Sequence, residues 1–200
     1  MRRNVRNILL TFVLSLMLVG PVLGNPNGPP WDNAGSLLIE EGCTCHGGGA
    51  PSIEVVVSVS GVPRAYNISE TYEFVISLQH ASNAGGGYLF WDGGIGTLTP
   101  GEGSKTVADS PGAVSQSEPG NDWTIQWTAP AEDAGPANFQ LVGNAVNGDG
   151  VPNEEDKWNI LAFTVSAPGA TEIATDEDVS LRTISAVSYT HLRAHETHEH

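Results

Sequence analysis

The sequence has few positive charges. Of its 200 residues, 8 are lysine or arginine and 23 are aspartate or glutamate, which gives a formal net charge of −15 at pH 7. A surface with this balance repels the phosphates of nucleic acids and the headgroups of anionic membranes. We therefore expect no nucleic-acid partner. We expect membrane contact only through a C-terminal anchor that this sequence lacks.

Cysteine and histidine are also scarce. The two cysteines, Cys43 and Cys45, are two positions apart and cannot join distant strands, so the core must be stabilised by packing alone. Four of the six histidines fall in the last ten residues, which leaves His46 and His80. With only these two, no Ser-His-Asp or Cys-His-Asn arrangement can be assigned. We expect the protein not to be an enzyme.

The N-terminus has the organisation of a secretory signal peptide. Three arginines among the first six residues precede an apolar run at residues 8–19. Small residues at 22–24 suit cleavage before Asn25. The apolar run is too short to span a membrane comfortably. We interpret residues 1–24 as a cleaved signal peptide, which predicts an extracellular or cell-surface protein in a compartment that permits disulfides.

The C-terminal residues differ in composition from the rest. Residues 187–200 contain four histidines and look like the in-frame translation of a sequencing adapter, so we treat them as non-native and assign them no zinc site. Residues 168–186 are acidic and rich in threonine, which predicts a linker. We expect the native chain to continue beyond Ala186.

The central part, residues 51–167, is predicted to be a β-domain. Short runs alternate between apolar and polar residues and are separated by glycine and proline, with no helical period. We predict an all-β, antiparallel, immunoglobulin-like β-sandwich of about seven to eight strands. The aromatic residues are assigned to its core. The predicted strands are residues 52–60, 71–79, 86–92 with a short continuation at 95–98, an edge strand within 106–116, 122–128, 137–146 and 158–165.

A candidate cofactor site precedes the first strand, within a predicted linker at residues 25–50. It is a Cys-Thr-Cys-His sequence, one residue shorter than the Cys-x-x-Cys-His run that attaches haem c covalently. In haem attachment, Cys43 and Cys45 would form the thioethers and His46 would ligate the iron. Both methionines lie in the signal peptide, so His80 is the candidate second axial ligand.

Three other interpretations of this motif remain open. A disulfide between Cys43 and Cys45 would be strained, and strained disulfides are redox-labile. A copper(I) or zinc site could use both thiolates and His46. A purely structural hairpin would leave reactive thiols exposed on an exported protein.

A second candidate site is the acidic turn at residues 147–156. Its oxygen donors alternate with glycines, and calcium takes six to eight oxygen ligands. The alternative is an ordinary solvated turn between strands. The candidate calcium ligands are Asn147, Asp149, Asn153 and Asp156.

Residues 40–166 resemble a known family. The resemblance rests on the Gly-Cys-Thr-Cys-His-Gly-Gly sequence, on Trp-Thr-Ile-Gln-Trp-Thr-Ala-Pro at 123–130, and on Val-Gly-Asn-Ala-Val-Asn-Gly-Asp-Gly at 142–150. These resemble Reeler-type domains, specifically the prokaryotic surface group called choice-of-anchor V. The resemblance implies an exported immunoglobulin-like sandwich, held by a C-terminal anchor, with a Cys- and His-containing motif before its first strand.

These observations together predict the function. We expect an exported, cell-surface, non-catalytic module that binds an unidentified surface or extracellular ligand, or serves in adhesion, and that carries a redox or metal motif. The alternative is a single c-type-haem electron-transfer protein.

Overall fold

The structure is a computed structural model that describes residues 27–28, 43, 50–81, 84–107, 112–170 and 182–185. The predicted signal peptide and the residues assigned to an adapter lie outside these ranges. The described residues form ten strands and no helix, so none of their segments is a helix that could cross a membrane. The strands are β1 (Val56–Val62), β2 (Thr71–Gln79), β3 (Gly87–Trp91), β4 (Thr97–Pro100), β5 (Ser104–Thr106), β6 (Ala113–Gln116), β7 (Asp122–Thr128), β8 (Ala137–Ala145), β9 (Lys157–Val165) and β10 (Arg182–Ser185).

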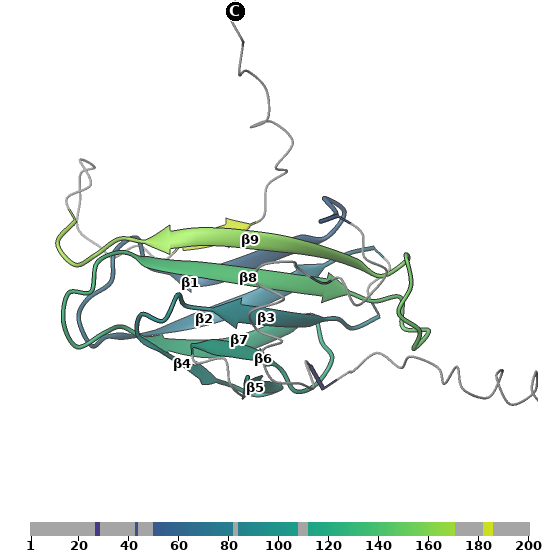
Figure 1. Cartoon of the computed structure of the whole chain (residues 1–200), viewed down its shortest axis with the longest axis horizontal. Helices are drawn as coiled ribbons and strands as arrows, with labels where there is room; N and C mark the ends of the chain where they lie inside the picture. The colour runs from purple at the N-terminus through teal and green to yellow at the C-terminus, as the bar shows by residue number, and fades with distance from the viewer. Residues whose placement is uncertain are drawn as a thin grey trace, which may run out of the picture.

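Two antiparallel sheets of five strands make up the domain (Figure 1). The first sheet has the order β10-β1-β2-β7-β4, and the second has the order β5-β6-β3-β8-β9. A core of apolar side chains from both sheets lies between them. The predicted all-β sandwich is therefore confirmed.

Strict alternation of side chains explains the first sheet. In β2, Tyr72, Phe74 and Ile76 are buried, whereas Thr71 and Glu73 are exposed. Successive side chains of a strand point to opposite faces of the sheet, so this pattern buries one face of β2 and leaves the other in water. The aromatic and branched residues of β7 alternate in the same phase, as predicted.

The aromatic centre of the core is Trp127, which is fully buried. Its ring meets Phe139 of the second sheet edge to face, with ring centroids 5.0 Å apart. It stacks on Phe74 of the first sheet at 6.2 Å. Its indole nitrogen donates a hydrogen bond to the backbone oxygen of Ile95 at 3.0 Å. Trp127 thus joins the two sheets and satisfies its polar atom at the same time.

The prediction that residues 95–98 continue the third strand is wrong. The strand in this region, β4, pairs with β7 in the first sheet, whereas β3 lies in the second sheet. Gly93, Gly94 and Gly96 all have positive φ. This conformation favours glycine and turns the chain from one sheet to the other.

The first predicted strand also begins too early. Residues 52–55 form a turn in which Val55 N donates to Ser52 O at 3.2 Å and Glu54 N donates to Ser52 Oγ at 3.3 Å. The hydroxyl and the carbonyl of Ser52 thus hold a local turn where β-branched composition alone suggested a strand.

A strand also forms inside the predicted C-terminal linker. β10 pairs antiparallel with β1, with Val59 opposite Ile184. Ile184 packs against the main core, and this contact positions the short strand. Four mostly polar residues carry too little alternation to be recognised as a strand.

Candidate functional site

The structure places only part of the predicted haem site. Cys43 is half-buried, whereas Cys45 and His46 lie outside the described residues. His80 follows β2 directly, and its side chain is 9% exposed. Its Nε2 atom lies 3.7 Å from the Glu54 carboxylate. The axial role of His80 and haem attachment both stay predictions.

In the candidate calcium loop, amide donors already contact the carboxylate of Asp149. One of its oxygens accepts from Val151 N at 2.7 Å, and the other accepts from the side-chain amides of Asn153 at 2.8 Å and Asn147 at 3.1 Å. These hydrogen bonds, that of Val151 first, lower the pKa of Asp149. The carboxylate is therefore stabilised in its charged form without a cation.

Asp156, at the other end of this loop, accepts from Asn147 N at 3.1 Å and is 6% exposed. The side-chain amide of Asn147 also donates a hydrogen bond to Glu155 Oε2, at 2.9 Å. A cation would need the oxygens of these asparagines to face it, and here their NH₂ groups face the acids. Among the residues that the structure describes, no three acidic, cysteine or histidine side chains are placed to share a metal. Calcium stays a prediction.

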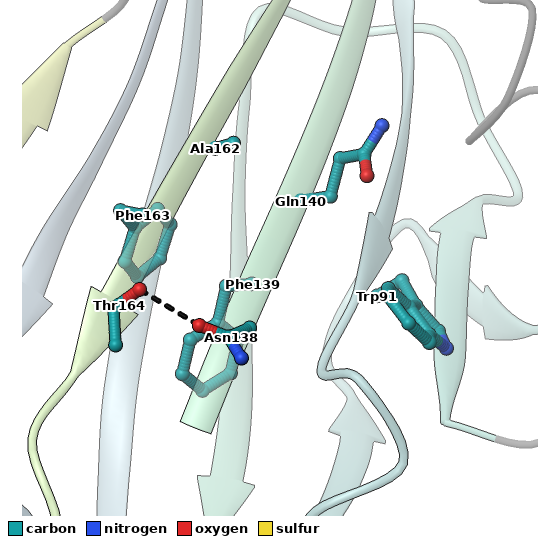
Figure 2. Close-up of a pocket in the computed structure, with 7 residues that line it drawn as sticks. All are labelled: Trp91, Asn138, Phe139, Gln140, Ala162, Phe163 and Thr164. Atoms are coloured by element: carbon teal, nitrogen blue, oxygen red, sulfur yellow. Dashed lines mark hydrogen bonds between the residues drawn. The ribbon is translucent and has the colours of Figure 1, made fainter. Parts of the chain in front are cut away.

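A pocket of about 250 Å³ lies on the second sheet, against β3, β8 and β9 (Figure 2). The strand register places Trp91 beside Gln140, and Gln140 beside Ala162. The next row along the sheet holds Asn138 and Thr164, which are joined by a hydrogen bond of 2.8 Å. All five side chains share one face. The remaining lining residues are Phe139 and Phe163.

The five side chains face away from the core. Phe139 and Phe163 alternate with them along β8 and β9, and their rings stack 5.0 Å apart on the core side of the sheet. The pocket therefore has the Trp91 indole on one side and two amides and a hydroxyl across its width (Figure 2). Among its lining side chains there is no formal charge, and the donors and acceptors suit a neutral polar ligand.

Sequence reasoning missed this site because it assigned the aromatic residues to the core. The alternation of inward and outward side chains along β3 could have revealed it. Phe90 contacts the core ring of Phe74 at 6.0 Å, so its neighbour Trp91 must point outward.

Next to the pocket, Asp92 is a fully buried acid. Its Oδ1 atom accepts a hydrogen bond from Gly94 N at 2.9 Å, and its Oδ2 atom has no partner among the described residues. Burial raises the pKa of Asp92 to about 6, and the hydrogen bond from Gly94 N only partly offsets that effect. Asp92 is closed to solvent and does not line the pocket.

Comparison with known proteins gives structural neighbours only. No family model and no curated protein matches the chain. The Reelin-N domain of F-spondin is 18% identical, with a TM-score of 0.42 over 62% of this chain and 95% of that chain. The human F-spondin reeler domain is 18% identical, with a TM-score of 0.39 over 58% and 94%. A structure described as "AvmM Catalyzes Macrocyclization in Alchivemycin A Biosynthesis" is 10% identical, with a TM-score of 0.34 over 62% and 94%.

TM-scores this low support no conclusion about function. The class of protein defined here, an antiparallel β-sandwich with an outward-facing pocket, rests on this chain's own strand order and side chains.

Proposed function

We propose that this protein is an exported, cell-surface, non-catalytic module that binds neutral polar ligands, such as glycans, for recognition or adhesion. One observation carries the proposal: the pocket on the outer face of the second sheet, where an indole lies beside amide and hydroxyl side chains. Export is inferred from the signal peptide predicted at residues 1–24.

Sugars present two kinds of surface, and the pocket offers a match for each. The C–H faces of a pyranose pack against an aromatic ring, and Trp91 supplies a ring that is only partly buried. The ring hydroxyls both donate and accept hydrogen bonds, as do the amides of Asn138 and Gln140. A charged ligand would find no opposite charge among the lining side chains.

The test is a glycan-array screen of the purified chain, followed by titration calorimetry with the best neutral glycan. Trp91→Ala should weaken binding at least about tenfold, because it removes the stacking surface. The matched control is Gln126→Ala, an exposed position on the outer face of the first sheet. If no neutral glycan binds, or if both variants bind like the parent, the proposal is wrong.

The Cys-Thr-Cys-His motif is proposed to be a soft-metal or redox site of the same module, with Cys43, Cys45 and His46 as its ligands. The haem-carrier alternative has less support, because the spacing between the two cysteines is one residue short.

A further inference from the structure

The outermost strand of the second sheet, β9, has a hydrogen-bonding edge that faces away from β8 (Figure 1). Along a strand paired on one side, the backbone groups of alternate residues point to the other side. Trp158 O accepts a hydrogen bond from Ser52 N, which lies outside β8, so Trp158 belongs to the outward row. The register with β8 is continuous, and the next residues of this row are therefore Ile160, Ala162 and Thr164.

Other parts of the chain close this edge at both ends. At its start, Ile160 N donates to Oδ1 of the preceding asparagine at 2.9 Å. At its end, the Arg182 guanidinium donates to Thr164 O at 3.0 Å. Beyond that point, Ser166 exchanges hydrogen bonds with residues 64 and 66. The part left open runs from Ile160 to Thr164, about 14 Å, which is the length of an extended segment of five residues.

Four backbone groups on this open edge have no hydrogen-bond partner among the described residues. They are Ile160 O, the N–H and the O of Ala162, and Thr164 N. Ala162 and Thr164 are exposed, so solvent reaches the middle of the edge. An added antiparallel strand would exchange two hydrogen bonds with Ala162 and form one with each flanking residue of the row. An extended polypeptide backbone supplies alternating donors and acceptors at this spacing.

The open edge also lacks the features that normally prevent strand addition. Edge strands of native proteins are commonly protected by charged side chains, proline or bulges. Residues 158–164 contain no charge and no proline, and no bulge interrupts the pairing of β9 with β8. On the core side of the edge, Phe163 is only partly buried and offers an apolar contact to a neighbouring side chain.

Arg182 gives one end of the open edge a positive charge. Among the described residues no carboxylate forms an ion pair with Arg182, although the whole chain has a net charge of −15. A carboxylate on a bound segment would therefore be attracted to the Thr164 end. A segment with many acidic residues would instead be repelled by the rest of the surface.

We propose that the open edge of β9 binds a short extended segment of another polypeptide, which adds a strand to the second sheet and carries one acidic residue beside Arg182. Backbone hydrogen bonds provide the affinity in this mode of recognition, and alternate side chains provide the specificity. The closed ends disfavour a second copy of this chain. Antiparallel pairing of two β9 strands about Ala162 would place Ser166 of each copy where Ser52 of the other lies.

The test begins with a random heptapeptide library screened on the purified full chain, and enriched peptides are then measured by titration calorimetry. The enriched sequences should lack a central proline and contain one acidic residue near an end. Each amide of an enriched peptide is next methylated in turn, which leaves its side chains intact. Methylation at alternate amides should weaken binding about tenfold, because these amides face β9. An effect that does not alternate, or a screen that enriches no peptide, would overturn the proposal.

Variants of the protein locate the site. Ala162→Pro removes the central N–H and should weaken peptide binding at least about tenfold, and proline is compatible with an edge strand. The matched control, Ala162→Ser, keeps the N–H and should bind like the parent. Arg182→Gln keeps a donor for Thr164 O and should abolish the preference for an acidic peptide over its amide analogue.

Thermal unfolding reports whether each variant keeps its fold. If Ala162→Pro unfolds, the methylation pattern measured on the parent decides the question. Equal peptide binding by the parent and by a folded Ala162→Pro variant would refute strand addition. The glycan titration of Trp91→Ala is a separate measurement, so either proposal can fail without the other.

Discussion

Replacing Asp92 by asparagine should make the protein more stable at neutral pH. The substitution keeps the shape of the side chain and the oxygen that accepts from Gly94 N. It removes a negative charge that is fully buried, with one oxygen unpartnered among the described residues. Removing an uncompensated buried charge stabilises the folded state.

The magnitude follows from the two pKa values. The carboxyl of Asp92 titrates at 3.8 in a reference state without burial and at about 6 in the folded protein. Below the lower value both states are protonated, and the parent has its full stability. As the pH rises from about 4 to about 6, only the unfolded state loses the proton, so folding becomes less favourable. A shift of about two units corresponds to about 3 kcal/mol.

Urea unfolding of parent and variant at about pH 3.5 and about pH 7.5 measures this effect. The stability gained by Asp92→Asn should be about 3 kcal/mol larger at the higher pH, or about 10 °C in melting temperature for a domain of this size. Asp133→Asn is the matched control, because Asp133 accepts the same kind of hydrogen bond from Gly135 N at 2.9 Å on the exposed surface. A gain for Asp92→Asn that does not change with pH would refute the reasoning.

Three further predictions concern the core and the two candidate cofactor sites. Trp127→Ala should cost about 4 kcal/mol in urea unfolding, because it empties the aromatic centre; a loss below about 1 kcal/mol would contradict that role. A pyridine haemochrome assay on the chain exported from a host with haem-attachment machinery should find no haem that survives acid–acetone extraction, because only one residue separates Cys43 from Cys45. A positive result that vanishes in the alanine variants would establish the electron carrier. Chelator should change the melting temperature by less than about 1 °C, because amides already satisfy Asp149. A calcium-dependent rise lost in Asp149→Ala and kept in Glu132→Ala would instead identify a calcium loop.

The sequence predicted those strands in which alternation is strict. β2 and β7 were expected with the bounds that the structure gives them, because large apolar side chains recur at every second position, with Val75 the one apolar residue on their outer faces. β4 and β10 have four residues each, and their positions depend on partners distant in sequence. Local patterns carry no information about such partners, so the sheet exchange at Gly93–Gly96 and the strand in the predicted linker could not be foreseen.

The candidate sites also differ in how far the sequence could predict them. Residue types alone identified the Cys-Thr-Cys-His motif and the acidic turn, but they could not show that Asn147 and Asn153 would direct amide NH₂ groups at the Asp149 carboxylate. The pocket depends on Trp91 being out of phase with Phe90 and on the register of three strands. The alternation within β3 was readable from the sequence, whereas the register between strands is not fixed by any single strand.

The pairing of β10 with β1 has a consequence for how copies of this protein behave at high concentration. β10 fills the open hydrogen-bonding edge of β1, and an open edge is where strands of other molecules add. Residues 171–181 separate β10 from the end of the preceding described segment, so the same four residues from a neighbouring molecule could fill that edge in its place. Intramolecular pairing prevails while the local concentration of its own strand exceeds that of its neighbours. Pairing within the chain thus closes the seven-residue edge of β1 and leaves the four-residue β10 as the outer edge of the sheet, which offers a neighbouring strand fewer hydrogen bonds.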